Sequence, residues 1–209
     1  YVSFSSLINS QATSVVPIKT WLEVNAAWIA GFYFSGVCLQ TLILISGFSK
    51  IKGIRNQQKT DLNLQWDKHL EKLSSSLKIN QKVSLYFSDK ILIPFTVGFI
   101  KPIILFPVAM INRLTIKQVE SILMHELAHI KRNDYALNIL QRMMEIILFF
   151  NPFAWLMAKE IKKEREFCCD DLVVEHSKNP DLYATALMLL EENKMHSLQL
   201  ALAATGSGK

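Results

Sequence analysis

The chain has 209 residues, half of them hydrophobic and a fifth charged, with a formal net charge of +5. A mean hydropathy of +0.21 is high for a purely soluble domain, and the length allows one sizeable core plus a membrane segment. Basic charge also suits nucleic acid, but no groove-reading motif accompanies it, so we expect no nucleic-acid partner.

The first strong feature along the chain is an uncharged run from Val24 to Phe48. These 25 residues are enough to cross the hydrocarbon layer as a helix, and Trp21 and Trp28 suit the interface at one end. We therefore predict a transmembrane helix at 23–49. A signal peptide has a shorter apolar region after a basic segment, and a buried core helix rarely stays uncharged for so long.

Charge on either side of this helix predicts its orientation. One basic residue, Lys19, precedes the helix, whereas four basic residues follow it: Lys50, Lys52, Arg55 and Lys59. The positive-inside rule then places residues 1–22 outside, and the basic linker 50–60 with all that follows it in the cytoplasm. We expect an integral protein of a bacterial cytoplasmic membrane, whose basic residues also contact anionic lipid headgroups.

Residues 61–107 indicate a helix followed by short strands. Apolar spacing predicts a helix at 61–79, and strand-like runs follow at 83–87, 91–93 and 103–106, separated by proline and glycine. We predict that 95–105 form an edge strand, at which Thr96, Val97 and Gly98 hold a substrate peptide as an added strand. The alternative is a hairpin that only covers the next helix.

The next helix carries the most informative pattern, His125-Glu126-Leu127-Ala128-His129. Thr115 and Gln118 form an S/T-x-x-E/Q capping box, so both histidines fall well inside a helix and lie on one face. Two imidazoles four residues apart can ligate one metal ion. In zinc peptidases the metal acidifies a water and the glutamate, here Glu126, takes its proton.

A catalytic zinc needs a third protein ligand and one open position. Downstream, Glu166 and Asp170 are four residues apart on one helical face, whereas Glu164 lies off that face. We choose Glu166 as the ligand and place Asp170 behind a ligand imidazole as an acceptor for its other N–H. Asp134 is a second candidate for such a contact. The expected cofactor is one Zn²⁺ ion.

The cysteines offer a rival site. A closed centre of two histidines with Cys168 and Cys169 would be structural, but neighbouring cysteines point in different directions on a helix. We prefer two free, buried thiols that pack as small apolar residues. Together with Cys38 in the predicted membrane helix, they fit a reducing cytosol without disulfides.

Residues 146–158 form a second apolar stretch, too short for an ordinary span and interrupted by Pro152. It is either a re-entrant or membrane-facing helical hairpin or a plain core hairpin. A helix from 156 to 176 carries Glu166, and a last helix starts at 179–181 and ends near Glu191 or Glu192. Residues 200–209 are expected to form a tail that leads out of a piece of a larger protein.

Four segments together resemble the BlaR/MecR-type integral-membrane metallopeptidases: 94–107 (PFTVGFIKPIILFP), 124–135 (MHELAHIKRNDY), 150–155 (FNPFAW) and 165–171 (REFCCDD). The resemblance covers roughly residues 20–200. It implies zinc held by His125, His129 and Glu166, with Glu126 as the general base. The best-known members are β-lactam sensors that cleave a cytoplasmic repressor, but the antibiotic signal does not follow from the resemblance.

We therefore expect an α+β, mainly helical metallopeptidase domain at 61–199, with a small edge sheet, tethered by the transmembrane helix. The expected function is zinc-dependent cleavage of a cytoplasmic protein, a repressor or the chain itself, within a transmembrane signalling system. Three alternatives stay open: an inactive zinc-containing receptor, a structural zinc module that depends on Cys168 or Cys169, and a DNA-binding protein.

Overall fold

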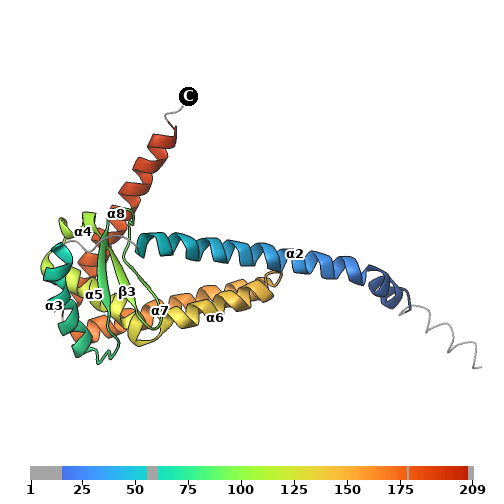
Figure 1. Ribbon diagram of the computed structural model, residues 1–209, viewed down its shortest axis with the longest axis horizontal. Coiled ribbons are helices and arrows are strands. Elements are labelled where there is room, and N and C mark those ends of the chain that lie inside the picture. Colours follow the sequence, from blue (N-terminus) through green and yellow to red (C-terminus); the bar gives the residue numbers. More distant parts are fainter. Residues whose placement is uncertain (1–15, 56–60, 178, 207–209) are drawn as a thin grey trace, which may run out of the picture. The chain divides into compact units, whose positions relative to one another are not determined.

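The computed structural model describes residues 16–55, 61–177 and 179–206 (Figure 1). The chain divides into two compact units, Tyr1–Ser49 and Lys50–Lys209, and each is described by itself. The expectations for residues 1–15, 56–60 and 207–209, which belong to the predicted outer segment, the basic linker and the tail, lie outside the described residues.

The first unit contains most of helix α2, Val16–Arg55. Its stretch Thr20–Gly47 is the one helical segment among the described residues that is long and apolar enough, by length and composition, to cross a membrane. At 1.5 Å per residue, 28 residues span about 42 Å, more than the hydrocarbon thickness of about 30 Å. Large apolar side chains cover its surface, and Trp28 is 81% exposed.

The second unit contains a three-stranded sheet in the order β1-β3-β2. Strand β1 (Ser84–Ser88) pairs parallel with β3 (Ile103–Pro107), and β2 (Phe95–Val97) pairs antiparallel with β3. The predicted strands at 83–87 and 103–106 are confirmed to within one residue. Because β3 lies between the other two strands, β2 is one edge of the sheet.

Two expectations for this region are wrong. Residues 91–93 do not form a strand: Leu92 and Ile93 form an exposed bend, and the next residue is a proline without a backbone N–H. The predicted edge at 95–105 is limited to 95–97, because 103–105 lie in the central strand. Gly98 follows β2 at a φ of +98°, where a Cβ would lie 2.9 Å from the carbonyl oxygen of Lys101, so the turn requires glycine.

Helix α5 (Ile116–Lys131) lies at the centre of this unit. It packs against α3 (Asp61–Ser76), α7 (Pro152–Ser177), α8 (Pro180–Gly206) and strand β2, and α4 (Val108–Ile111) follows β3. Leu123 and Leu127 of α5 are fully buried together with Ile104 and Phe106 of β3. The mainly helical α+β fold with a small sheet is confirmed.

Helices α6 (Asp134–Ile147) and α7 form a hairpin, joined by a tight turn at residues 148–151 (Figure 1). Pro152 is well suited to the first helical position, and the side chain of Asn151 accepts a hydrogen bond from the backbone N–H of Phe153. Helix α7 therefore begins four residues before the expected position. Helix α8 continues to Gly206, well past the predicted end, because the intervening residues are rich in Leu and Ala, strong helix formers.

Candidate metal centre

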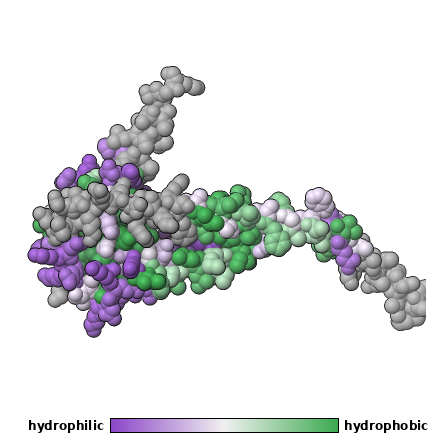
Figure 2. All heavy atoms as spheres, in the orientation of Figure 1, coloured by the Kyte–Doolittle hydropathy of each residue, from purple (hydrophilic) through white to green (hydrophobic). Residues whose placement is uncertain are grey.

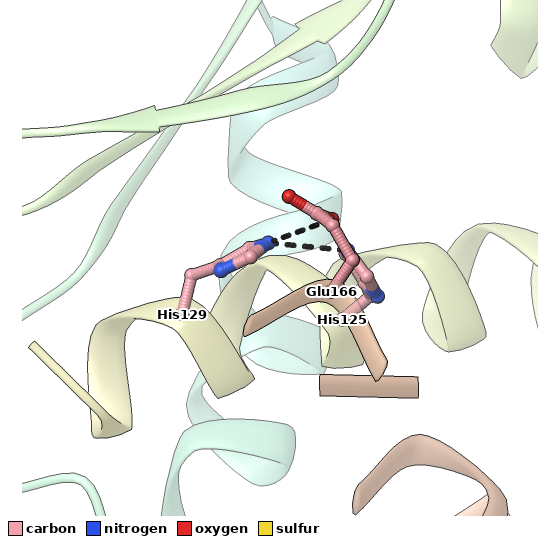
Figure 3. Close-up of side chains that lie close together, drawn as sticks. All are labelled: His125, His129 and Glu166. Atoms are coloured by element: carbon pink, nitrogen blue, oxygen red, sulfur yellow. Dashed lines mark hydrogen bonds and ion pairs between the residues drawn. The ribbon is translucent and has the colours of Figure 1, made fainter. Parts of the chain in front are cut away.

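Helix α5 carries the two histidines and begins at a well-defined N-terminal cap. The Thr115 side chain accepts a hydrogen bond from the Gln118 backbone, and the Gln118 side chain accepts one from the Thr115 backbone, so the predicted capping box is confirmed. His125 and His129 follow in the third and fourth turns. Their Nε2 atoms are 3.2 Å apart, and both point toward α7 (Figure 3).

Helix α7 brings the third candidate ligand to the same place. Glu166 Oε2 lies 3.5 Å from His125 Nε2 and 3.7 Å from His129 Nε2 (Figure 3). Donor atoms about 2.0–2.1 Å from a tetrahedral zinc lie about 3.3 Å from one another. The three donors therefore fit one zinc ion with little rearrangement, and nitrogen and carboxylate oxygen are donors that zinc accepts.

Each histidine is held by a second contact on the far side of its ring. His129 Nδ1 donates to Asp134 Oδ2 at 2.8 Å, and Asp134 is buried. His125 Nδ1 lies 2.8 Å from the Tyr183 hydroxyl and 3.1 Å from Asp170 Oδ1. Because Tyr183 donates its own proton to Asp170 at 2.6 Å, its oxygen is left to accept from His125. Both Nε2 atoms thus face the ligand side.

Glu126 lies beside this triad and is 7% exposed. The hydroxyl of Thr96 donates to Glu126 Oε2 at 2.8 Å, which ties the edge strand β2 to the carboxylate. Burial raises the pKa of Glu126, although the neighbouring His129 and His125 act in the opposite direction. A carboxylate of raised pKa that is fixed by one hydrogen bond can accept a proton from a nearby water.

The electrostatics of the ligands favour a charged pair while no metal is bound. Burial lowers the pKa of His125, but contacts with Asp170 and Glu166 outweigh burial and raise the pKa to about 9. The contact with His125 holds the pKa of Glu166 below its ordinary value, against the effect of burial. A metal cation at this position therefore replaces a proton that the two acids already attract.

A second group of donors, formed by His129, Asp134 and Cys169, also lies within 4.8 Å. The Cys169 Sγ atom is 3.3 Å from His129 Nδ1 and 3.6 Å from Asp134 Oδ2. Burial raises the pKa of Cys169 far above its ordinary value, so in the absence of a metal the group remains a thiol. The expectation of two buried thiols is wrong for Cys168, which is exposed; neighbouring positions on a helix face different sides.

An open cleft of about 500 Å³ runs past the triad, lined by residues of β2, α5, α6, α7 and α8. Thr96 and Gly98 line it on the sheet side, and Glu191 and Lys194 on the α8 side. The candidate ligands and Glu126 are therefore reached from solvent, and the cleft is large enough for several residues of an extended peptide. Gly98 lies in the turn after β2 instead of within the strand.

Sequence reasoning missed Tyr183. Tyr183 lies 58 residues after His125 on another helix, and no local motif marks it. Its one signal in the sequence is its position on the buried face of α8, three residues before Ala186. Arg132, which directly follows α5, pairs with Asp134 at 3.5 Å.

A family model described as BlaR1 peptidase M56 matches residues 3–206 of the chain. The chain belongs to this family. Peptidase M56 is a metallopeptidase family, so membership implies a metal. The histidine, carboxylate and thiol donors on α5, α6 and α7 form two groups that are close enough together to bind one.

Relatives of this M56 member are named as a regulatory protein and as methicillin resistance proteins. The chain is 32% identical to "Regulatory protein BlaR1" of Bacillus licheniformis over 156 residues, which are 72% of this chain and 24% of that protein. It is 26% identical to "Methicillin resistance mecR1 protein" of Staphylococcus aureus (strain Mu50 / ATCC 700699) over 149 residues, 71% of this chain and 24% of that protein. The protein of the same name from Staphylococcus epidermidis gives the same values. The chain spans about a quarter of the length of these relatives.

Proposed function

We propose that this chain is the catalytic part of a membrane-anchored zinc metalloendopeptidase, which cleaves a protein on the cytoplasmic side within a transmembrane regulatory system. One observation carries the proposal. Two Nε2 atoms and one carboxylate oxygen converge at 3.2–3.7 Å, and a separate buried carboxylate, Glu126, lies beside them in an open cleft. A structural zinc site would need four protein donors and no such neighbour.

The proposed chemistry is hydrolysis of a peptide bond. A bound zinc ion would supply Lewis acidity, which lowers the pKa of a water and polarises the carbonyl group under attack. Glu126 accepts the proton of the attacking water and returns it to the leaving amine. Thr96 keeps the Glu126 carboxylate in place through its hydroxyl, and Asp134 and Tyr183 keep the two imidazoles oriented.

The substrate is proposed to bind as an extended strand along β2. Thr96 and Val97 lie at an edge of the sheet, and residues around them line the cleft next to Glu126. Backbone hydrogen bonds to such an edge give binding without a strict sequence requirement. The substrate class is a cytoplasmic or membrane-adjacent protein, with a repressor or the chain itself as the two expectations, because the relatives are named as regulatory and resistance proteins.

The test is Glu126→Gln in the full chain, reconstituted in lipid and loaded with zinc. The amide keeps the shape of the carboxylate and its hydrogen bond from Thr96, but it cannot accept the proton. We expect one zinc per chain as in the wild type and loss of cleavage of casein or of the chain itself by a factor of about 100 or more. Glu164→Gln, an exposed neighbour of the third ligand, is the control and keeps activity.

Two results would overturn this proposal. Unchanged cleavage by the Glu126→Gln variant would remove Glu126 from the chemistry. A wild-type chain that binds zinc at the triad but cleaves nothing under any condition that activates its relatives would favour the proteolytically inactive, signal-transducing receptor instead.

A further inference from the structure

The outer end of the α6–α7 hairpin is covered by apolar side chains that the metal centre does not use. No charged residue occurs from 146 to 158. Eight large apolar side chains in this part of the hairpin are 49–73% exposed: Met143, Met144, Ile147, Phe150, Phe153, Trp155, Leu156 and Met157. Figure 2 shows hydrophilic residues over the body of this unit and hydrophobic residues along the hairpin. Within the described residues, this end of the hairpin is therefore not packed into a core.

Charged side chains surround the base of this apolar end. Within 139–163, four residues are basic and two are acidic. Arg142 on α6 pairs with Glu145 at 2.6 Å, which neutralises the acid nearest to the turn on that helix. On α7 the first charge is Lys159, followed by the exposed Lys162 and Lys163. Long basic side chains at this position can reach lipid phosphates while their stems lie on apolar surface.

We propose that the end of the α6–α7 hairpin inserts into one leaflet of an anionic lipid bilayer, as an attachment separate from α2. From Lys159 back to the turn at Asn151 the helix measures about 12 Å, and from Arg142 forward to Leu148 about 9 Å. The length on α6 falls within the depth of about 5–10 Å to which interfacial helices bury their apolar faces, and the length on α7 slightly exceeds it. The proposal rests on the membrane location within the proposed function.

Hydrogen bonds at the base of the hairpin lie next to the metal centre. Arg165, the residue before the third ligand, is buried and donates to Asn138 and Gln141 of α6, which joins the two helices at the base of the hairpin. Along α7, Glu166 lies about 21 Å from Pro152. An inserted hairpin would therefore hold the cleft within about 20 Å of the lipid surface, where it selects substrate segments close to the membrane.

The experiment uses fluorescent probes on single cysteines in the full chain, held in nanodiscs of phosphatidylcholine and phosphatidylglycerol. Cys38 and Cys168 are replaced by serine, Cys169 is buried and stays, and the environment-sensitive dye NBD is attached at Phe153→Cys. A separate variant that keeps Cys38 and lacks Cys168 carries the dye on α2 as the lipid control. In the background that lacks both cysteines, Lys117→Cys at the exposed start of α5 is the water control. Each probe is challenged with nitroxide lipids and with aqueous iodide.

We expect the probe at position 153 to emit at shorter wavelength than the probe at 117, to lose emission with nitroxide lipids and to resist iodide. Quenching by iodide while the Cys38 probe reports lipid would refute the inserted hairpin and leave the α2 anchor intact. Blue-shifted emission that resists both quenchers would mean that a protein surface covers the hairpin, which also refutes the proposal. A Cys38 probe that reports water would remove the membrane location and the hairpin proposal together.

Discussion

At the scale of single residues, each candidate ligand on α5 is oriented by a different partner. His129 donates to the buried carboxylate of Asp134, whereas His125 shares Asp170 with the hydroxyl of Tyr183. The two arrangements leave Nε2 of both rings facing Glu166. Such contacts fix the tautomer and the ring orientation, so residues that never touch a metal still set its affinity.

Tyr183→Phe removes the hydroxyl that connects His125 and Asp170 and leaves the aromatic ring, which is 3% exposed, in the core. We expect zinc binding to weaken about tenfold, because the imidazole loses one of its orienting contacts. A titration against a chelator of known affinity measures this change. Tyr86→Phe on β1 serves as the control, and equal zinc affinity for both variants would contradict the role of Tyr183.

The raised pKa of His125 predicts how zinc affinity depends on pH. Below about 9 the metal-free histidine carries a proton, which must leave before Nε2 can bind a cation. Zinc affinity should therefore rise with pH, by up to about tenfold per unit, and level off as pH passes the pKa. Affinities measured from neutral pH upward in a competing chelator test this. A flat profile over that range would mean that His125 is neutral in the metal-free chain.

At the scale of elements, sequence patterns predict a helix or strand best where the interactions that form it lie within one turn of the chain. The capping box and apolar spacing predict α5 to the residue at its start, because both act within one turn. Tyr183 is out of reach of such signals, since only the packing of α8 on α5 brings it to His125. Residues 91–93 show the same limit: three apolar residues are compatible with a strand, but 95–97 provide the pairing with β3.

Gly98→Ala tests the turn that presents the β2 edge to the cleft. A left-handed φ and a carbonyl oxygen 2.9 Å from the new Cβ both oppose a side chain, so we expect a loss of about 1 kcal/mol or more in the free energy of unfolding. Thermal unfolding of the full chain in detergent measures this. Gly47→Ala, where a Cβ would meet nothing within 4 Å, is the control; equal stability of the two variants would show that the turn relaxes.

At the scale of the whole molecule, one chain of a metallopeptidase family carries a candidate membrane span and a second unit that holds the candidate metal centre. The span is predictable from its uncharged run alone, whereas the side on which the second unit lies rests on four basic residues after the span. That orientation remains a prediction. It decides whether the cleft meets cytoplasmic or external proteins, and so which substrates it can reach.

Labelling of Lys117→Cys tests the orientation in cells, in the background that lacks Cys38 and Cys168. We expect a membrane-impermeant maleimide to react only after the cytoplasmic membrane is opened, because the basic residues after α2 keep the second unit inside. A cysteine introduced at Lys19, before the span, should react while the cytoplasmic membrane is still intact, provided that the reagent can pass the outer layers of the cell. The reverse pattern would place the cleft outside.

The zinc content of four purified chains tests the central claim most directly: wild type, Glu166→Ala, Glu164→Ala and Cys169→Ser. We predict one tightly bound zinc in the wild type, Glu164→Ala and Cys169→Ser, and loss of that zinc in Glu166→Ala, because Glu166 Oε2 lies 3.5 and 3.7 Å from the two histidine nitrogens. Zinc retained by Glu166→Ala and lost by Cys169→Ser would contradict it and move the metal to the donors His129, Asp134 and Cys169.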